Sequence, residues 1–311
     1  MTPKLLLLLA STTLAAPSMA QSTQPAQAQT PAALATNQPA IPAEQPAAAK
    51  PEKWQDRVSL TLGNDFTNAY FFRGIRQEDN GFITQPYASL SIAAVKTDDL
   101  TLNLNFTNWN SFHDNRTNAS PNRGSFMQAW YEADYVAGAS LVVGNWTAGL
   151  TYTWLDSPSG GFKDQEELAI SGAFNDSEAL GPWSLKPSLT VVFETSGGAA
   201  DGQDRGIYAQ LALTPGTDLD LSENTKLRLD LPVILGTSLS DYYQNADGGD
   251  DFFGFLAVGP KLTIPLPLPA GFGAWSISTS ATYLLMGDNA RDFNAGDSAE
   301  WIFAAGFAVS F

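Results

Sequence analysis

The sequence predicts an all-β protein, an antiparallel transmembrane β-barrel of about 12 strands of the outer-membrane type. Three observations predict this fold: an N-terminus typical of exported proteins, repeated runs in which apolar residues alternate with polar or small ones, and a last run that ends on an aromatic residue. A period of two places successive side chains on opposite faces of a strand. In lipid, the apolar face of such a strand turns outward and the polar face lines the lumen.

Residues 1–20 are expected to be a signal peptide. Met1–Lys4 is a positively charged lead, Leu5–Ala16 is apolar, and residues 18–20 fit a small-x-small cleavage site. The apolar run is too short for a membrane-spanning helix, and no later stretch reaches the roughly 18 apolar residues that such a helix needs. The chain contains no Cys, which excludes disulfides, thiolate metal sites and lipid attachment through a cysteine.

Residues 21–53 consist mostly of Ala, Pro, Gln, Thr and Ser. Such a segment buries too little apolar surface to offset the entropy of ordering, so we expect a disordered linker on the periplasmic side. A plain spacer is the preferred interpretation, and a tether across the periplasm or to the cell wall is the alternative.

Twelve alternating runs follow within residues 54–311, which are expected to form the barrel domain. A tilted membrane strand needs about 9–11 residues, and bacterial single-chain barrels have an even number of strands. Ten or fourteen strands are the alternatives. The runs centre on Val58–Phe72, Phe82–Val95, Leu100–Trp109, Met127–Ala137, Leu141–Trp154, Glu167–Phe174, Leu185–Glu194, Gly206–Thr214, Lys226–Gly236, Phe252–Pro265, Ala274–Met286 and Glu300–Phe311.

The connections alternate in length, as expected when periplasmic turns are short and outer loops are long. The predicted periplasmic turns include Lys96–Asp99, Gly138–Ser140 and Leu266–Phe272, with Asn175–Trp183 and Pro215–Thr225 as longer exceptions. The predicted outer loops are Asn110–Phe126, Thr237–Asp251 and Gly287–Ala299, together with a tight first turn at Asp79–Gly81.

The last run resembles the C-terminal signature of bacterial outer-membrane barrels, which the barrel-assembly machinery reads. Its alternating large residues are Trp301, Phe303, Phe307, Val309 and Phe311. The resemblance implies a bacterial, Gram-negative outer-membrane location, with outer-membrane lipid, lipopolysaccharide and the assembly machinery as partners. A soluble β-sandwich shows the same alternation, but it does not account for the signal peptide and the aromatic strand ends.

One segment is similar to a known family. Tyr70-Phe71-Phe72-Arg73-Gly74-Ile75-Arg76-Gln77 resembles the Tyr-x-Phe-Arg-Gly-[Ile/Val]-x-Gln element of a family of uncharacterised bacterial outer-membrane barrels. The similarity covers the first third of the barrel. It implies a barrel and no chemistry, and we interpret Arg73 and Gly74 as a structural arginine and a bend glycine rather than as a ligand site.

The net negative charge of the chain favours cations as its ligands or solutes. Acidic residues outnumber basic ones by 32 to 16, for a net charge of −16, which argues against nucleic-acid partners. The acidic loop containing Asp247, Asp250 and Asp251 is a candidate calcium site. Because it lacks EF-hand spacing, a solvated loop is preferred. Divalent cations bridging loops to lipopolysaccharide are a further alternative, and no cofactor is expected.

Charged residues on the inward faces of the runs are candidates for lining the lumen and setting its selectivity. A buried charge is costly unless it is paired or wet, so these residues either line a water-filled path or form a salt-bridged plug. They are Asp65, Glu132, Asp134, Lys186, Glu194, Arg228, Asp230 and Lys261.

An enzymatic function is not the preferred hypothesis. A lipid hydrolase would need a Ser with a His base, and the one histidine, His113, is expected in a surface loop near Ser111 and Ser125. No nucleophile elbow surrounds these serines. Glu132 and Asp134 have the chemistry of a general acid–base pair, but no feature of the sequence suggests a substrate.

The leading functional hypothesis is a narrow channel for passive passage of small polar or cationic solutes. The second is a structural or surface-interaction barrel with a plugged lumen and cation-binding acidic loops. A lipid hydrolase is the third.

Overall fold

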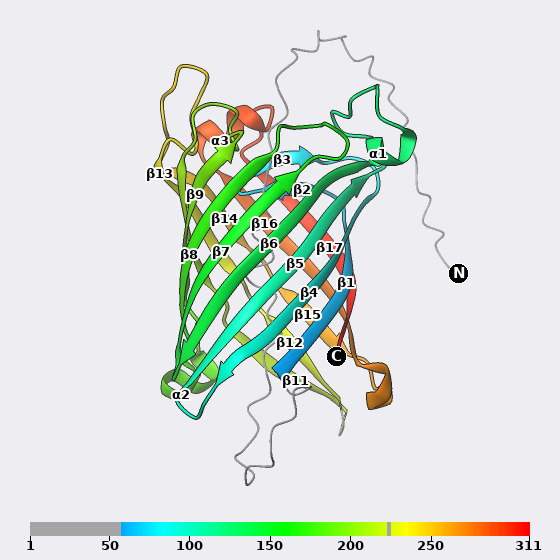
Figure 1. Cartoon of the computed structure of the whole chain (residues 1–311), viewed down its shortest axis with the longest axis vertical. Coiled ribbons are helices and arrows are strands. Elements are labelled where there is room, and N and C mark those ends of the chain that lie inside the picture. The colour runs from blue at the N-terminus through cyan, green and yellow to red at the C-terminus, as the bar shows by residue number, and fades with distance from the viewer. Residues whose placement is uncertain (1–56, 223–224) are drawn as a thin grey trace, which may run out of the picture.

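The computed structural model describes residues 57–222 and 225–311, and within these residues the chain forms a closed antiparallel barrel of twelve wall strands (Figure 1). Wall strands pair with their neighbours along the chain, and β17 (Ala299–Ser310) closes the ring by pairing with β1 (Val58–Thr67). The predicted fold class and strand number are therefore confirmed. The predicted signal peptide and linker lie outside the described residues.

Nine wall strands are continuous in the described part of the chain, and three are each split in two. The continuous strands are β1, β4 (Ile83–Lys96), β5 (Leu100–His113), β6 (Trp130–Val143), β7 (Trp146–Asp156), β8 (Gln165–Phe174), β9 (Ser188–Gly197), β16 (Ala274–Met286) and β17. The split strands are β10 (Ile207–Leu213) with β11 (Gly216–Ser222), β12 (Thr225–Asp230) with β13 (Val233–Ser240), and β14 (Phe253–Val258) with β15 (Lys261–Pro265).

The helices are short and lie at the two ends of the barrel (Figure 1). They are α1 (Ser125–Ala129), α2 (Ser177–Leu180), α3 (Asp288–Phe293) and the 3₁₀ helices η3 (Gly181–Trp183) and η4 (Ala270–Phe272). We call the end that carries α1 and α3 the mouth, and the end that carries α2 the base. Among the described residues, no helix has the length and apolar character to cross a membrane.

Each split strand is interrupted at a proline, namely Pro215, Pro232 or Pro260. Proline has no N–H to donate to the ladder. The carbonyl oxygen of each proline still accepts a hydrogen bond from the adjacent strand, at 2.8, 3.3 and 3.1 Å respectively. The wall therefore continues past each break. The predicted long turn Pro215–Thr225 is wrong, because the chain beyond Pro215 forms β11.

The predicted turn at Gly138–Ser140 is also wrong, because β6 runs through it to Val143. Gly138 is small for a packing reason: a Cβ there would lie 2.7 Å from the carbonyl oxygen of Leu150 on β7. The actual turn contains Gly144, whose φ of 54° suits glycine. The other long connection, Asn175–Trp183, is present and contains α2 and η3.

The faces of the wall agree with the prediction. Outward apolar side chains such as Phe106, Trp146 and Leu150 are 47, 64 and 51% exposed, as expected for residues that contact lipid. On β17 and just after it, Trp301, Phe303, Phe307 and Phe311 are likewise exposed. Val309 differs: it is buried against the turn that ends at Gly273, where an added Cβ would lie 2.7 Å from its Cγ2.

The two faces of β17 should respond differently to charge. Phe307→Arg places a cation on the lipid face and should cost about 2–4 kcal/mol of unfolding free energy. Ala308→Arg is the matched control, because that side chain points to the lumen, where its charge stays near water. Urea titration of both variants in phospholipid vesicles tests this expectation, and equal losses would contradict the assignment of the faces.

Candidate functional site: an occluded lumen

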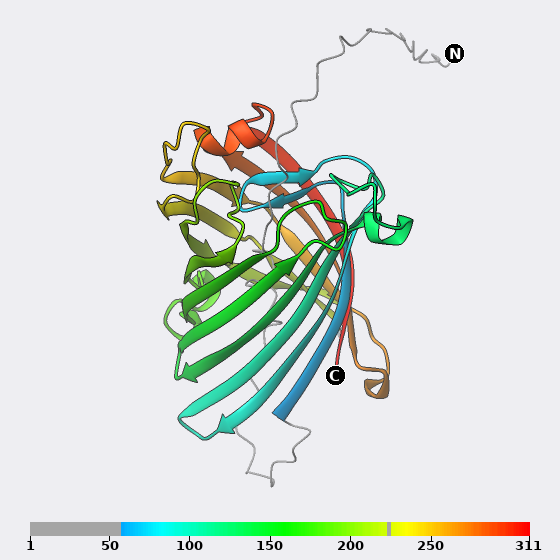
Figure 2. The same cartoon turned by 45° about the horizontal axis from the view of Figure 1, so that its top comes forward.

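The first outer connection folds back over the barrel. β1 ends at Thr67, and β2 (Tyr70–Phe72) pairs with β3 (Ile75–Glu78) in a separate two-stranded sheet. This plug hairpin, residues 70–78, lies across the mouth (Figure 2). The predicted strand Val58–Phe72 is therefore too long, and the first outer connection is a 68–82 segment rather than the tight turn at Asp79–Gly81.

Asn68 marks the point where the chain leaves the wall. Its side-chain Nδ2 donates to the carbonyl oxygen of Trp301 at 3.1 Å, and its Oδ1 accepts from the N–H of Phe303 at 2.6 Å. The side chain thus replaces the ladder that a longer β1 would make with β17. The Thr67 hydroxyl donates to the carbonyl oxygen of Ala69 at 2.7 Å and stabilises the bend toward the lumen.

Apolar side chains from the plug hairpin and from widely separated wall strands form one buried cluster. The hairpin contributes Tyr70, Phe72 and Ile75, which are 6% exposed or less. Wall strands and mouth loops contribute Trp109, Tyr131, Leu155, Val192, Tyr208, Tyr242, Tyr243, Phe255, Leu284 and Met286. Because residues from facing walls pack in one cluster with the hairpin, side chains fill the mouth half of the lumen.

Arg73, at the tip of the hairpin, is the central polar contact of this cluster. Its Nη1 and Nη2 donate to Oε1 and Oε2 of Glu167 on β8 at 2.9 and 2.8 Å, a bidentate pair. Nη1 also donates to the Tyr242 hydroxyl at 2.5 Å. The guanidinium carbon lies 4.4 Å from the ring centre of Phe72 and 4.5 Å from that of Tyr208, within cation–π range.

The backbone and the electrostatics at this tip are both unusual. Arg73 and Gly74 have φ values of 46° and 86°, a left-handed conformation that a β-carbon disfavours at Arg73. Burial disfavours the charge of Arg73, but the Glu167 carboxylate and Tyr242 outweigh it and raise the pKa of the guanidinium above its usual value. The Tyr243 hydroxyl donates to the carbonyl oxygen of Arg73 at 2.7 Å. The arginine is therefore charged and fixed at both backbone and side chain.

Three further predicted lumen residues lie beside this tip. Glu132 and Asp134 on β6 are fully buried, and the Tyr70 hydroxyl donates to Glu132 Oε2 at 2.9 Å. Among the described residues, Glu132 Oε1 and both carboxylate oxygens of Asp134 have no hydrogen-bond partner. Glu194 on β9 accepts backbone N–H bonds of 2.7 Å from Ala200 and Gly206. Arg73 interacts electrostatically with both Asp134 and Glu194.

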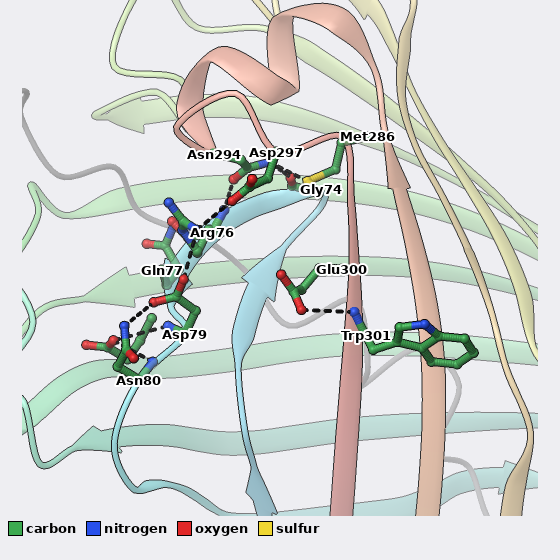
Figure 3. A network of polar contacts seen from close by, with 11 residues as sticks. Gly74, Arg76, Gln77, Asp79, Asn80, Met286, Asn294, Asp297, Glu300 and Trp301 are labelled. Atoms are coloured by element: carbon green, nitrogen blue, oxygen red, sulfur yellow. Dashed lines mark hydrogen bonds and ion pairs between the residues drawn. The ribbon is translucent and has the colours of Figure 1, made fainter. Parts of the chain in front are cut away.

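Loop 287–298, which contains α3, lies beside the hairpin, with Asn294 and Asp297 next to Gly74 and Arg76 (Figure 3). Asn294 is fully buried; its Oδ1 accepts from the N–H of Arg76 at 2.6 Å and its Nδ2 donates to the carbonyl oxygen of Gly74 at 2.7 Å. The Arg76 guanidinium forms ion pairs with Asp79 at 2.8 Å and Asp297 at 3.3 Å. These bonds hold the backbone of the hairpin turn against the mouth.

His113 is buried at the end of β5, so the prediction of a surface histidine is wrong. Its Nε2 lies 2.9 Å from the Ser111 hydroxyl and its Nδ1 2.7 Å from the Thr117 hydroxyl, which donates to Glu78 Oε2 at 2.6 Å. A Ser–His pair at this distance is the arrangement of an activated nucleophile. Here Ser111 has no exposed surface. The hydrogen bonds from Ser111 through His113 and Thr117 to Glu78 connect β3 of the hairpin to the wall.

The remaining predicted lumen residues are Asp65, Lys186, Arg228, Asp230 and Lys261. Asp65 packs beside Gly306, and it interacts electrostatically with Lys261. Arg228 bonds to Asp230 Oδ1 at 2.8 Å on the same strand. Lys186 lies in the connection before β9 rather than in a wall strand. Inward residues around these groups are polar or small and only half-buried, among them Ser89, Asn105, Thr107, Ser140, Ser276, Ser278 and Ala304.

The candidate calcium residues do not converge. Asp250 accepts bonds from the Ser238 hydroxyl at 2.8 Å and from the backbone N–H groups of residues 241 and 243 at 2.9 and 3.1 Å. Asp251 accepts from the N–H of Asn289 at 3.3 Å. Within the described residues, no group of three potential metal ligands including Asp247 gathers. Asp250 instead shapes the loop that presents Tyr242 and Tyr243 to Arg73.

Comparisons with known proteins assign no function to any residue of this chain. No protein-family model matches the chain, and no curated protein matches it in sequence. Solved structures with a similar fold include the COG4313 outer membrane channel from Pseudomonas putida F1, at 15% identity and a TM-score of 0.46, covering 82% of this chain and 96% of that one. The beta domain of the Bordetella autotransporter BrkA has 13% identity and a TM-score of 0.43, with coverages of 82 and 99%.

LpxR from Salmonella typhimurium is similar at 10% identity and a TM-score of 0.39, covering 81% of this chain and 99% of that one. None of these similarities assigns an activity to this chain. The resemblance of residues 70–77 to an uncharacterised barrel family stays a prediction.

Replacing Gly74 by Ala should displace the hairpin. A Cβ there would lie 2.8 Å from Cβ of Phe255, and its φ of 86° already disfavours an L side chain. Gly248→Ala is the matched control, because that glycine has a similar φ of 80° but faces open space. Hydrogen exchange of amides 70–78 should accelerate at least about tenfold in the first variant only. Equal exchange in both variants would contradict a tightly packed hairpin turn.

The loop that carries Asp201 should become more stable as pH falls. Burial raises the pKa of Asp201 to about 6, with Asp250 adding to the shift, above the roughly 3.9 of an unfolded chain. The folded state therefore gains a proton and stability as pH drops through 6, and this gain is complete below about 4. Protonation of Asp201 should make the urea midpoint higher at pH 5 than at pH 7.5. Asp201→Asn should remove this contribution, whereas Asp204→Asn, at an exposed neighbouring position, should leave it unchanged. An unchanged difference in Asp201→Asn would contradict the assignment.

Proposed function

We propose that this protein is an outer-membrane barrel that is closed at rest and that passes small polar or cationic solutes when the plug hairpin leaves the lumen. One observation carries the proposal: the hairpin is part of the cluster that fills the mouth half, whereas the base half has a polar, half-exposed lining. A closed mouth above a lumen with a polar lining supports a gated channel. The leading sequence hypothesis is thereby changed from a narrow open channel to a gated one.

The exposed apolar wall supports the proposed location in a bacterial outer membrane. Outer-membrane lipid, lipopolysaccharide and the barrel-assembly machinery remain its proposed partners. An excess of carboxyl groups at the closed section supports cations over anions as the solutes, since Glu132, Asp134, Glu167 and Glu194 lie on the nearby strands β6, β8 and β9 on the side of the wall that Arg73 contacts.

A structural barrel with a permanently fixed plug is the second candidate. The number of polar anchors favours it: the hairpin is bonded to Glu132, Tyr131, Glu167, Thr117 and Asn294, which lie on several different elements. We do not propose an enzyme, because the Ser111–His113 pair is sealed by the hairpin.

Planar-bilayer recording of two forms separates these functions. The first is the full-length mature barrel, and the second has residues 70–78 replaced by a short Gly/Ser turn. A control trims only the exposed tip 245–249, which leaves Tyr243 and Asp250 in place. Folding of each form is checked by its heat-dependent migration on a gel.

We expect the intact barrel and the control to be silent apart from rare openings, and the form without the hairpin to give discrete cation-selective steps. A folded barrel that stays silent without its hairpin would overturn the gated channel and leave the structural function. Equal conductance with and without the hairpin would overturn the occlusion itself.

A further inference from the structure

Most of the site that holds the Arg73 guanidinium is formed by residues outside its own hairpin. Glu167 comes from β8, Tyr208 from β10, and Tyr242 from the loop between β13 and β14. Together they provide a carboxylate fork at 2.8–2.9 Å, a ring at 4.5 Å and a hydroxyl at 2.5 Å. Only the Phe72 ring, at 4.4 Å, belongs to the hairpin. If the hairpin leaves, three sides of the site stay on the barrel.

The chemistry of these three sides selects a planar organic cation. A carboxylate accepts two parallel N–H bonds from a guanidinium, a geometry that a compact ammonium does not match. An aromatic face stabilises a cation that has lost part of its water. Tyr208 is itself held by a hydrogen bond from its hydroxyl to Gln210 Oε1 at 2.9 Å, so its ring does not depend on Arg73 for its position.

We propose that Glu167, Tyr208 and Tyr242 form a binding site for solutes that carry a guanidinium or a similar planar cationic group, and that Arg73 is an internal ligand that fills this site while the barrel is closed. Such a solute competes with Arg73 and favours release of the hairpin, because binding to only one of two states shifts their equilibrium. The binding site stands on the geometry of the Arg73 contacts, whereas its use in passage rests on the proposed function.

The neighbouring carboxyl groups extend the site along the lumen. Asp134 and Glu194 interact electrostatically with Arg73, and Glu132 lies beside Asp134. When Arg73 leaves, four carboxyl groups remain on strands β6, β8 and β9 without this guanidinium. A patch of carboxylates on one side of a constriction favours cations over anions. The preferred solute class is therefore cationic, with the aromatic rings adding the preference for a delocalised charge.

Chemical rescue tests the binding site directly. Arg73→Ala removes the internal ligand and leaves a space shaped for guanidinium. The purified full-length variant, shown to be folded by heat-dependent migration, is titrated with methylguanidinium chloride and followed by NMR. We expect saturable binding that is at least about tenfold weaker for methylammonium, and no binding of urea, which has a similar planar shape but no charge.

Two further variants give the controls. Glu167→Gln in the Arg73→Ala background should weaken methylguanidinium binding by at least about tenfold, because the neutral amide offers one acceptor instead of a charged fork. Arg76→Ala removes a guanidinium from the same hairpin that pairs with Asp79 and Asp297 but has no aromatic face over it in the described structure. It should create no saturable site.

Binding by Arg73→Ala that requires Glu167 would support the proposal. No saturable binding, binding of urea and methylguanidinium alike, or an equal site in Arg76→Ala would overturn it. Should Arg73→Ala not fold, the intact protein is tested instead: methylguanidinium should accelerate hydrogen exchange of amides 70–78 relative to equimolar sodium chloride, and unchanged exchange would overturn the competition.

The two proposals fail separately, because this binding is measured without any current. A site that binds methylguanidinium in a barrel that never conducts would refute the gated channel and keep the binding site. A barrel that conducts after hairpin removal but binds no methylguanidinium would refute the binding site and keep the gated channel.

Discussion

The buried ion pair between Arg73 and Glu167 determines the arrangement of the mouth. Removing one partner of a buried pair leaves an uncompensated charge and costs about 3–5 kcal/mol, so the hairpin and β8 are strongly coupled. The loop that contains Tyr242 and Tyr243 depends on the same arginine, through one bond to its guanidinium and one to its carbonyl oxygen. Asp250 in turn orders that loop with bonds to its backbone.

This interaction divides the lumen into two environments. Toward the mouth, aromatic and aliphatic side chains exclude water, which strengthens every remaining charge–charge contact. Toward the base, hydroxyl and amide groups form bonds along the wall, such as Ser89 to Thr107 and Asn105 to Ser140. The contrast between a polar lumen lining and an apolar plug with a buried ion pair is the structural basis of the proposed gated passage.

The strand number and the faces of the wall followed from period-two patterning, and so did the inward position of Glu132, Asp134 and Glu194. The plug hairpin did not, because Tyr70 and Phe72 alternate in the same way whether they face lipid or a buried lumen. Gly138 imitated a turn because close strand packing and turns both favour glycine. Arg73 contacts Glu167 on β8, 94 positions away, and Tyr208 on β10, which is still more distant in the sequence, and no local pattern records such pairing. The Tyr-x-Phe-Arg-Gly segment, with an arginine before a glycine, was the one feature of the sequence that could have indicated the plug hairpin.

A double-mutant cycle on Arg73 and Glu167 tests the central claim most directly. The free energy of hairpin release is measured from hydrogen exchange of amides 70–78 in the wild type, Arg73→Ala, Glu167→Gln and the double variant. The ion pair predicts that each single change costs about 3 kcal/mol or more and that the double change costs little beyond one of them. Additive losses, or no effect on the hairpin amides, would show that this pair does not hold the plug in the lumen.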